Sequence, residues 1–209
     1  MKQLLIIGAS GHGKVVAEIA RRNGFQNIAF LDDNTQIKAC GGFPVIGTSS
    51  SFREHLSACF FVAIGNPAVR TRLMEMLLKA GCTVVTLIHP SAVVSDDCSI
   101  GTGTVIMPGA VINAGTTIGK GCIINTGATV DHDNQIADYV HISVGAHLAG
   151  SVTVGSSAWV GAGAIISNNL SVCCGAILGA GAVVIRKIEL PGTYVGIPAK
   201  LIKKAEASV

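Results

Sequence analysis

The sequence predicts two halves of different fold class within one chain of 209 residues. The first half alternates short apolar runs with helical patterns, which is typical of an α/β domain with a small parallel sheet. In the second half an aliphatic residue recurs at every sixth position, which is typical of a β-helix. We therefore expect a Rossmann-like N-terminal domain, residues 1–88, followed by a left-handed parallel β-helix, residues 89–209.

The N-terminal half contains four apolar runs and two amphipathic segments. The predicted strands are Gln3–Ile7, Ile28–Leu31, Phe60–Ile64 and Val84–Ile88, and the predicted helices are Lys14–Arg22 and Ala68–Lys79. Glycine follows each helical segment, at Gly24 and at Gly81, as expected at a helix end. Because ligands of parallel sheets bind at the carboxyl ends of the strands, the loops after the strands are the expected binding site.

The six-residue repeat runs without insertion through most of the C-terminal half. Its sixteen aliphatic positions are Val94, Ile100, Ile106, Ile112, Ile118, Ile124, Val130, Ile136, Ile142, Leu148, Val154, Val160, Ile166, Val172, Leu178 and Val184. Two residues before these positions, from Cys98 to Ala182, eleven of fifteen residues are Ala, Cys or Thr, which are small enough for the corners of a triangular coil. Three sides make an 18-residue coil, which predicts about five coils stacked about 4.8 Å apart.

Composition argues against several functional classes. The net charge is only +3, which argues against nucleic acid as a partner. No apolar run reaches the ~18–20 residues of a membrane span, and Met1–Ser10 does not resemble a signal peptide. The seven cysteines form no CxxC pair, which indicates reduced thiols and a cytoplasmic protein. A mean hydropathy of +0.57 with 13% charged residues indicates that a partner subunit covers apolar surface.

Five motifs carry a resemblance to a known family. They are Gly8-Ala9-Ser10-Gly11-His12-Gly13, Phe30-Leu31-Asp32-Asp33, Ala63-Ile64-Gly65-Asn66, Asp131-His132-Asp133 and Gly196-Ile197-Pro198-Ala199-Lys200. Together with the hexapeptide run they resemble the sugar O-/N-acyltransferases, which include sialic-acid O-acetyltransferases and bacterial UDP-4-amino-sugar N-acetyltransferases. The resemblance covers nearly all of residues 2–204. It implies a homotrimer that holds acetyl-CoA in a cleft between neighbouring β-helices.

His132 is the candidate general base, because a neutral imidazole near pH 7 can take the proton of an attacking amine or hydroxyl. Asp131 and Asp133 flank it, and a carboxylate can orient the ring. Successive strand residues face opposite ways, so one of the two should contact the ring; the resemblance assigns this role to Asp133. It also places Asn125 near the sugar and His132. The alternatives are a surface turn for residues 131–133 and a corner cap for Asn125.

Two further histidines, His141 and His147, are one repeat apart, which predicts equivalent corners on adjacent sides of the coil. His132 and His141 are half a coil apart and could share a site only across a subunit interface. The resemblance makes His141 a contact to acetyl-CoA, whereas His147 is expected to be structural. The other residues that the resemblance assigns to the cofactor are Gly150, Ala162, Ala180 and Lys200. No two histidines are 36 residues apart, so a zinc site like that of β-helical carbonic anhydrases is not expected.

The N-terminal half carries a candidate nucleotide site. Ser10 and Gly11 open the first helix, where exposed amides favour phosphate, and the resemblance directs His12 toward the sugar nucleotide. Asp32 and Asp33 follow the second strand and could accept hydrogen bonds from a ribose or a uracil, unless they only form a turn. The remaining residues that close this cleft are Gly65 and Asn66.

These observations predict an acetyl-CoA-dependent N-acetyltransferase of a UDP-linked amino sugar. No Cys or Ser stands in a nucleophile setting beside His132, which favours direct transfer in a ternary complex over a covalent intermediate. The unbroken repeat predicts an obligate homotrimer that is inactive as a monomer, with Asn125, His132 and Asp133 on one side and His141 from a neighbour. Two alternatives stay open: O-acetylation of sialic acid or a related sugar, and a non-catalytic β-helix that binds a ligand.

Overall fold

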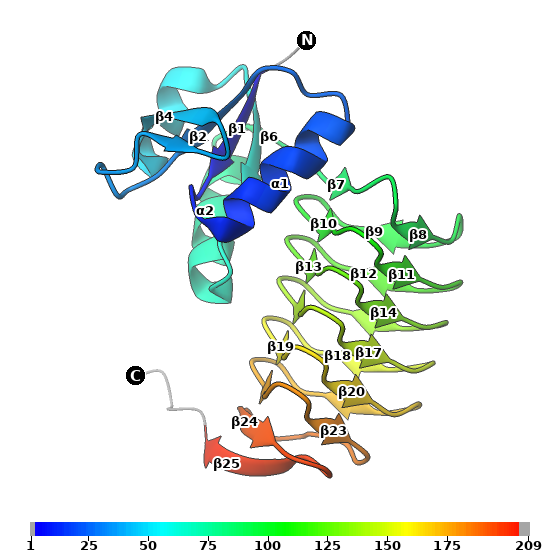
Figure 1. Cartoon of the computed structure of the whole chain (residues 1–209). Helices are drawn as coiled ribbons and strands as arrows, with labels where there is room; N and C mark the ends of the chain where they lie inside the picture. Colours follow the sequence, from blue (N-terminus) through cyan, green and yellow to red (C-terminus); the bar gives the residue numbers. More distant parts are fainter. Residues whose placement is uncertain (1–2, 205–209) are drawn as a thin grey trace. The chain divides into compact units, whose positions relative to one another are not determined.

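The computed structural model describes residues 3–204 and divides into two units, residues 1–90 and 91–209 (Figure 1). In the N-terminal unit a sheet has the order β3-β4-β2-β1-β5-β6. Its strands are β1 (Leu4–Ile7), β2 (Ile28–Leu31), β3 (Ala39–Cys40), β4 (Phe43–Gly47), β5 (Cys59–Val62) and β6 (Thr83–Val84). All neighbours are parallel except β3 and β4, which form an antiparallel pair.

The helices of this unit are α1 (Gly11–Arg22), the 3-10 helix η1 (Ser49–His55) and α2 (Pro67–Lys79). Every residue of β1, β2 and β5 is buried, as expected of central parallel strands covered on both faces. The α1 helix crosses β1 closely, because a Cβ at Gly13 would collide with the carbonyl oxygen of Gly8. This close approach explains two of the glycines in the first motif.

The predicted N-terminal elements are present, with three differences. The first helix begins at Gly11 rather than Lys14, so His12 lies in its first turn. The run Val84–Ile88 is not one strand, because the chain leaves the sheet after β6 and forms a separate strand, β7 (Leu87–Ile88). The β3–β4 pair and η1 were not predicted, since these segments are short and their burial alternates with exposure instead of forming an apolar run.

The C-terminal unit is a β-helix whose two-residue strands stack into three faces. The β8 face consists of β8 (Val93–Val94), β11 (Val111–Ile112), β14 (Thr129–Val130), β17 (His147–Leu148), β20 (Ile165–Ile166) and β23 (Val183–Val184). The β9 face consists of β9 (Ser99–Ile100), β12 (Thr117–Ile118), β15 (Gln135–Ile136), β18 (Thr153–Val154) and β21 (Ser171–Val172). The β10 face consists of β10 (Val105–Ile106), β13 (Ile123–Ile124), β16 (His141–Ile142), β19 (Trp159–Val160), β22 (Ile177–Leu178), β24 (Gly192–Val195) and the antiparallel β25 (Lys200–Lys204).

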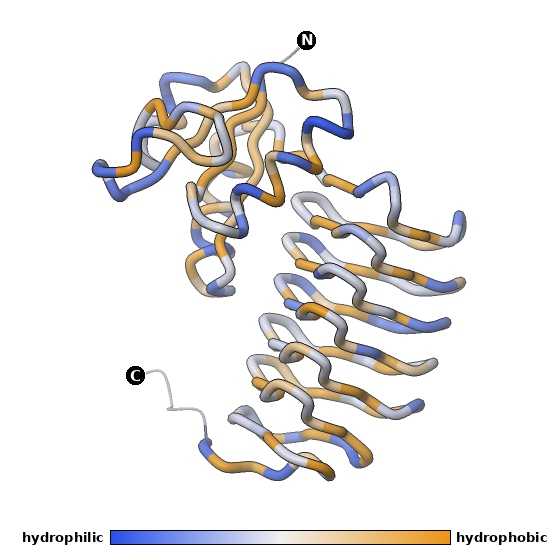
Figure 2. Tube along the Cα trace, in the orientation of Figure 1, coloured by the Kyte–Doolittle hydropathy of each residue, from blue (hydrophilic) through white to orange (hydrophobic). Residues whose placement is uncertain are grey.

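Each strand of the coils pairs in parallel with the strand 18 residues later, for example Thr129 with His147. The second residue of each strand points inward, and the aliphatic side chains from Ile106 to Val184 form one continuous buried core. The small residues two positions earlier, such as Ala110 and Ala128, are also fully buried. Many of the hydrophilic segments lie at the corners (Figure 2). The predicted fold class, including the 18-residue coil, is confirmed.

One inward position of the coil is polar and supports a corner. Asn134 is fully buried where most repeats have Ala, Cys or Thr. Its amide group donates to the carbonyl oxygens of Asp131 and Ala149 at 2.6 and 3.0 Å, and its carbonyl oxygen accepts from the backbone N–H of Val152. The side chain therefore ties the turn of residues 131–134 to the next coil.

Replacing this amide should destabilise the β-helix. In Asn134→Ala, buried backbone groups lose their partners, so the free energy of unfolding should fall by about 2–4 kcal/mol in denaturant titrations. The exposed neighbour Gln135 provides the control, since Gln135→Ala should stay within about 0.5 kcal/mol of the parent. Equal effects of the two substitutions would contradict this role.

Candidate active site

His132 and Asp133 form a hydrogen-bonded pair at one corner of the β-helix. They lie where the chain passes from the β8 face to the β9 face, which we call the His132 edge. The Nδ1 atom of His132 lies 2.7 Å from Oδ2 of Asp133, and both side chains are exposed. Because an ionised carboxylate can only accept, Nδ1 carries the proton and Nε2 keeps its lone pair. A neutral His132 can therefore accept a further proton at Nε2.

The backbone explains how two adjacent residues can pair. Asp133 has φ +57°, in the left-handed region that Asp tolerates better than most residues. The expectation that the two residues lie on a strand is wrong, because both lie in a turn. Asp131 does not contact the ring, since its Oδ1 accepts the backbone N–H of His132 at 2.9 Å and the side-chain amide of Asn113 at 2.8 Å. Asp133 is thus the partner of the ring, and Asp131 fixes the turn.

These contacts set the charges of the site. The hydrogen bond to Asp133 is the largest cause that raises the pKa of His132 above its ordinary value, and partial desolvation opposes it. Hydrogen bonds from Asn113 and from the backbone of His132 lower the pKa of Asp131. His132 is therefore a stronger base than a free imidazole, and Asp131 stays ionised at neutral pH.

Glycines leave room for the pair in the neighbouring coils. A Cβ at Gly150, 18 residues after His132, would collide with its imidazole ring. A Cβ at Gly115, 18 residues before Asp133, would meet Oδ1 of that residue. Gly150 therefore lies against His132 within one chain. A side chain at either position would push the pair out of its place.

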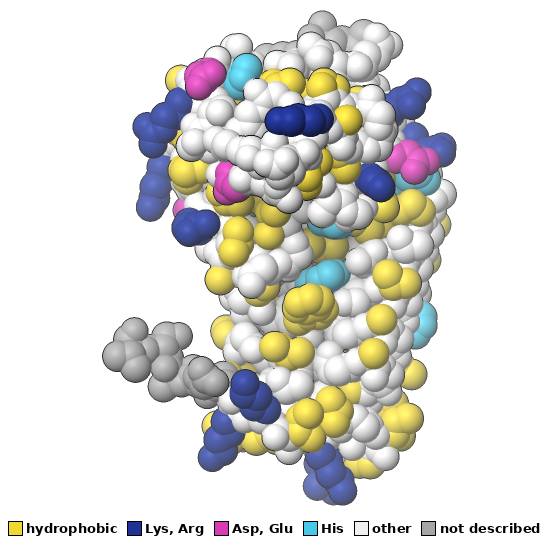
Figure 3. All heavy atoms as spheres, turned by 60° about the vertical axis from the view of Figure 1, so that its left-hand side comes forward, with side chains coloured by type: hydrophobic (Ala, Val, Ile, Leu, Met, Phe, Trp, Pro, Cys, Tyr) yellow, Lys and Arg dark blue, Asp and Glu magenta, His cyan; other side chains and the backbone are white. Residues whose placement is uncertain are grey.

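A second polar cluster lies where the chain passes from the β10 face to the β8 face, which we call the Asn125 edge. The Nδ2 atom of Asn125 lies 3.1 Å from Nε2 of His141. The ring of His141 stacks on Trp159, with centroids 5.1 Å apart and an interplanar angle of 25°. The Nε1–H group of Trp159 donates to Oγ of Ser143 at 2.8 Å. Histidine and hydrophobic side chains lie side by side on one face of this unit (Figure 3).

Two predictions about this cluster are wrong. Asn125 does not share a side with His132 and Asp133; it contacts His141, because the two corners are seven residues apart and belong to different edges. His141 and His147 do not lie at corners, because each is the first residue of a strand, in β16 and β17. The predicted cofactor residues also divide: Ala162 and Ala180 follow strands of the β10 face, at the Asn125 edge, whereas Gly150 lies at the His132 edge.

In the N-terminal unit the predicted substrate residues surround the strand ends. Asp32 accepts the backbone N–H of Ala9 at 2.6 Å with one oxygen and that of Asn34 with the other. Asp33 accepts both the backbone N–H and the hydroxyl of Ser49, at the start of η1. Both carboxylates therefore hold loops in place. Ser10 precedes α1 and makes no side-chain cap hydrogen bond to it, and Gly11 is exposed beside it.

The loop after β5 is held by its own hydrogen bonds. The side-chain oxygen of Asn66 accepts the backbone N–H groups of Ala68 and Val69 and so caps α2. Arg70 is buried, and its Nη1 donates to the carbonyl oxygens of Ile64 and Gly65 at 2.8 and 2.7 Å. Gly65 and Asn66 thus have structural partners within the loop.

His12 lies in the first turn of α1 with its Nε2 atom buried and without a hydrogen-bond partner. Burial, and then the charge of Arg70, lower the pKa of His12 to about 4. The ring is therefore neutral at physiological pH, and it can hydrogen-bond a ligand without adding charge to the site.

Known proteins match both units. The PglD N-terminal domain family matches residues 3–77, and the bacterial transferase hexapeptide family (six repeats) matches residues 97–132. The acetyltransferase domain of PglB from Neisseria gonorrhoeae is 42% identical, with a TM-score of 0.94, over 97% of this chain and 100% of that chain. The chain belongs to the hexapeptide-repeat sugar acyltransferases with a PglD-type N-terminal domain. The resemblance inferred from the motifs is confirmed.

Other members of this family bind or act on sugar nucleotides. PerB from Caulobacter crescentus, solved with CoA and GDP-perosamine, is 38% identical, with a TM-score of 0.92, over 97% of this chain and 98% of that chain. UDP-N-acetylbacillosamine N-acetyltransferase of Bacillus subtilis is 42% identical over 110 residues, 50% of this chain and 51% of the relative. GDP-perosamine N-acetyltransferase of Escherichia coli O157:H7 is 34% identical over 48% of each chain. The chain thus spans about half the length of the curated relatives it matches.

The 18-residue spacing could have revealed the residues that sequence reasoning missed in this family member. Asn113 precedes Asp131 by one coil, and Trp159 follows His141 by one coil. Ser143 was missed because its contact to Trp159 depends on side-chain conformation. Within residues 3–204, no group of three or more His, Cys, Asp or Glu residues is placed to hold a metal ion. The same residues contain no helix that is both long and apolar enough to span a membrane.

The pairing of His132 with Asp133 can be tested by titration. By NMR, His132 should titrate above the ordinary imidazole value of about 6.5. In Asp133→Asn this pKa should move down, because the ionised acceptor is lost. Asp138→Asn, on a neighbouring corner that does not contact the ring, is the control and should leave the pKa of His132 unchanged. An unchanged titration in Asp133→Asn would contradict the pairing.

Proposed function

We propose that this protein is an acetyl-CoA-dependent N-acetyltransferase that acts on the amino group of a nucleotide-linked sugar, with His132 as the general base. The observation that carries the proposal is the His132–Asp133 pair, whose geometry leaves Nε2 free to take a proton. The named relatives of known activity are N-acetyltransferases of UDP- and GDP-linked sugars, which supports the same chemistry. No observation favours O-acetylation.

The proposed reaction is a direct transfer. The amine nitrogen attacks the thioester carbonyl carbon, the C–S bond breaks, and CoA leaves as its thiolate. Nε2 of His132 takes the amine proton as the C–N bond forms, and Asp133 stabilises the resulting imidazolium. Within residues 3–204, no hydrogen bond joins Nε2 of His132 to a Cys or Ser, which supports a ternary complex rather than an acyl-enzyme.

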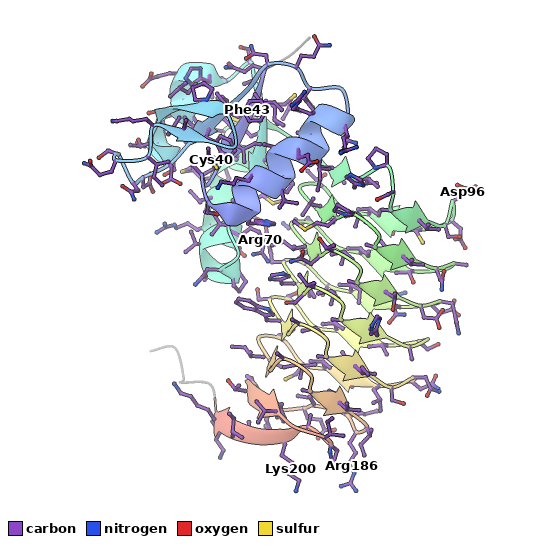
Figure 4. The ribbon with its side chains drawn as sticks, in the orientation of Figure 1. Cys40, Phe43, Arg70, Asp96, Arg186 and Lys200 are labelled. Atoms are coloured by element: carbon purple, nitrogen blue, oxygen red, sulfur yellow. The ribbon has the colours of Figure 1, made fainter. Side chains whose placement is uncertain are left out.

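We assign acetyl-CoA to the Asn125 edge and the adjoining end of the β-helix. His141, Ala162 and Ala180 would contact it along this edge, and Gly150 would contact it across the cleft from the His132 edge of a neighbour. Lys200 borders a hollow of about 340 Å³ together with Arg186 and Lys187. Arg186 and Lys200 lie at the same end of the β-helix (Figure 4). Three cations beside a hollow suit the phosphates of CoA.

We propose a homotrimer that packs through the β8 face. This face lies between the His132 edge and the Asn125 edge, so threefold packing along it would bring the His132 edge of one subunit to the Asn125 edge of the next. Val93 and Ile165 are exposed on it, and it holds a hollow of about 580 Å³ lined by Asp131, His147 and apolar side chains. The β9 face instead presents Ser99, Thr117, Gln135, Thr153 and Ser171, which suits solvent.

We assign nucleotide binding to the N-terminal unit. The amides at the start of α1 favour phosphate, and neutral His12 can hydrogen-bond the ligand. Asp32 borders a hollow of about 250 Å³ beside β4. UDP is the proposed nucleotide and GDP the alternative that the perosamine relatives favour. The substrates of this reaction are metabolites of the cytoplasm, where we place the enzyme.

The first test removes the base. In His132→Ala, kcat/KM should fall by about 10²–10⁴-fold, the usual worth of a general base. Size-exclusion chromatography with light scattering must show an unchanged oligomeric state, and His147→Ala is the matched control. Retention of more than about a tenth of the activity would rule out the role of His132 as base.

The second test asks whether the site spans two subunits. His132→Ala and His141→Ala should each be inactive as pure trimers. After the two are mixed, unfolded and refolded together in equal amounts, about a quarter of the sites should combine an intact His132 with an intact His141 from the neighbour. No recovery of activity in the mixture, with trimers formed, would contradict a site between subunits.

The third test identifies the nucleotide by thermal shift. At a hundredfold excess over Kd, UDP should stabilise the native state by about 2.7 kcal/mol and raise Tm, with GDP and CMP as comparisons. Asp32→Ala should abolish the shift, whereas Asp96→Ala, an exposed acid of the β-helix unit, should retain it. A shift with GDP alone would identify the other nucleotide, and no shift with any nucleotide would contradict the assignment of this unit.

A further inference from the structure

The cluster at the Asn125 edge fixes the proton of His141. Oδ1 of Asn125 accepts the backbone N–H of Thr126 at 2.8 Å, which identifies the oxygen of the amide. The other arm of the amide, Nδ2, therefore faces Nε2 of His141 at 3.1 Å. Because Nδ2 can only donate, Nε2 must accept, and the ring proton resides on Nδ1. His141 is held as one neutral tautomer whose Nε2 lone pair is already occupied.

The ring is also fixed by its neighbours on the β10 face. His141 lies between Ile123, one coil earlier, and Trp159, one coil later, and each is its direct register partner. Trp159 stacks on the ring, and its indole is anchored in turn to Ser143, which is buried. Rotation of the imidazole would break the bond to Asn125 and the stack together.

We propose that Asn125, Ser143 and Trp159 are positioning residues that hold His141 as the neutral Nδ1–H tautomer, and that the exposed part of Trp159 contacts acyl-CoA. This inference rests on the proposed use of acetyl-CoA at this edge. Trp159 is 37% exposed, and the next side chain of its column, Ile177, is 42% exposed, so the column presents an apolar strip beside His141. Such a strip suits the uncharged pantetheine arm rather than the phosphates.

The arrangement assigns different work to the two histidines. His132 has a carboxylate at Nδ1 and an available Nε2, which suits a base. His141 has an amide donor at Nε2 and cannot take a proton there without losing that bond. His141 therefore does not compete with His132 for the proton of the amine; it can serve the reaction only as a hydrogen-bond donor through Nδ1.

The tautomer can be read directly from ¹⁵N chemical shifts of the histidine rings in the full-length protein. Wild-type His141 should show a protonated Nδ1 and an unprotonated Nε2 that do not exchange over the neutral pH range. Asn125→Ala should convert this pattern to a mixture of tautomers that titrates with pH. Thr153→Ala, on the β9 face, is the control. An unchanged His141 pattern in Asn125→Ala would overturn the assignment.

The contact to acyl-CoA can be followed by fluorescence, because Trp159 is the one tryptophan of the sequence. Acetyl-CoA, added without acceptor, should change the emission of Trp159 with the same Kd that calorimetry gives. Trp159→Phe keeps a stack and should stay within about threefold of wild type in KM for acetyl-CoA, whereas Trp159→Ala and Ser143→Ala should raise it by about tenfold or more.

The outcomes separate this inference from the proposed function. Acetyl-CoA that binds in calorimetry but leaves both the emission and the KM of Trp159→Ala unchanged would overturn the contact alone. No binding of acetyl-CoA at all would overturn the proposed function and the contact, while the ¹⁵N pattern would still decide the tautomer. A KM effect of Trp159→Ala that Trp159→Phe rescues, with an unchanged oligomeric state, supports the positioning role.

Discussion

The 18-residue register of the β-helix is the constraint on which the rest of the structure depends. Each inward aliphatic residue packs on the one 18 positions later, and the backbone pairs in parallel at the same spacing. A single insertion would shift the later side chains away from these partners. Because the register is unbroken, contacts between coils follow by arithmetic: His132 lies against Gly150, and His141 lies against Trp159. The chemistry of each edge is therefore built from residues in neighbouring coils.

The structure gives two imidazoles opposite hydrogen-bonding environments. At the His132 edge a carboxylate accepts from the ring and raises its pKa, which favours proton uptake. At the Asn125 edge an amide donates to the ring and opposes proton uptake at the same nitrogen, Nε2. Residue type alone cannot separate these roles. The difference arises because Asp133 adopts a left-handed turn conformation, whereas His141 sits on a regular strand.

The N-terminal unit uses its polar residues for two purposes at once. Asp32, Asp33 and Asn66 follow strands, as sequence reasoning predicted for a ligand site, yet each is hydrogen-bonded to the backbone of a loop. These bonds shape the loops, and a carboxylate keeps further lone pairs for a ligand. Buried Arg70 joins the loop after β5 to α2 and keeps His12 neutral. The shape and the charge of this unit thus depend on the same side chains.

The sequence by itself determined the fold class, the coil length and the position of His132, because hydrophobic periodicity and short motifs are local properties. It also predicted that His132 and His141 lie on different sides of one prism, since nine residues are half a coil. Only the tertiary structure decided the partners: Asp133 rather than Asp131 on the ring of His132, and Asn125 on His141. These contacts depend on backbone angles at the corners and on side-chain conformations across coils. Neither quantity is encoded in the six-residue period.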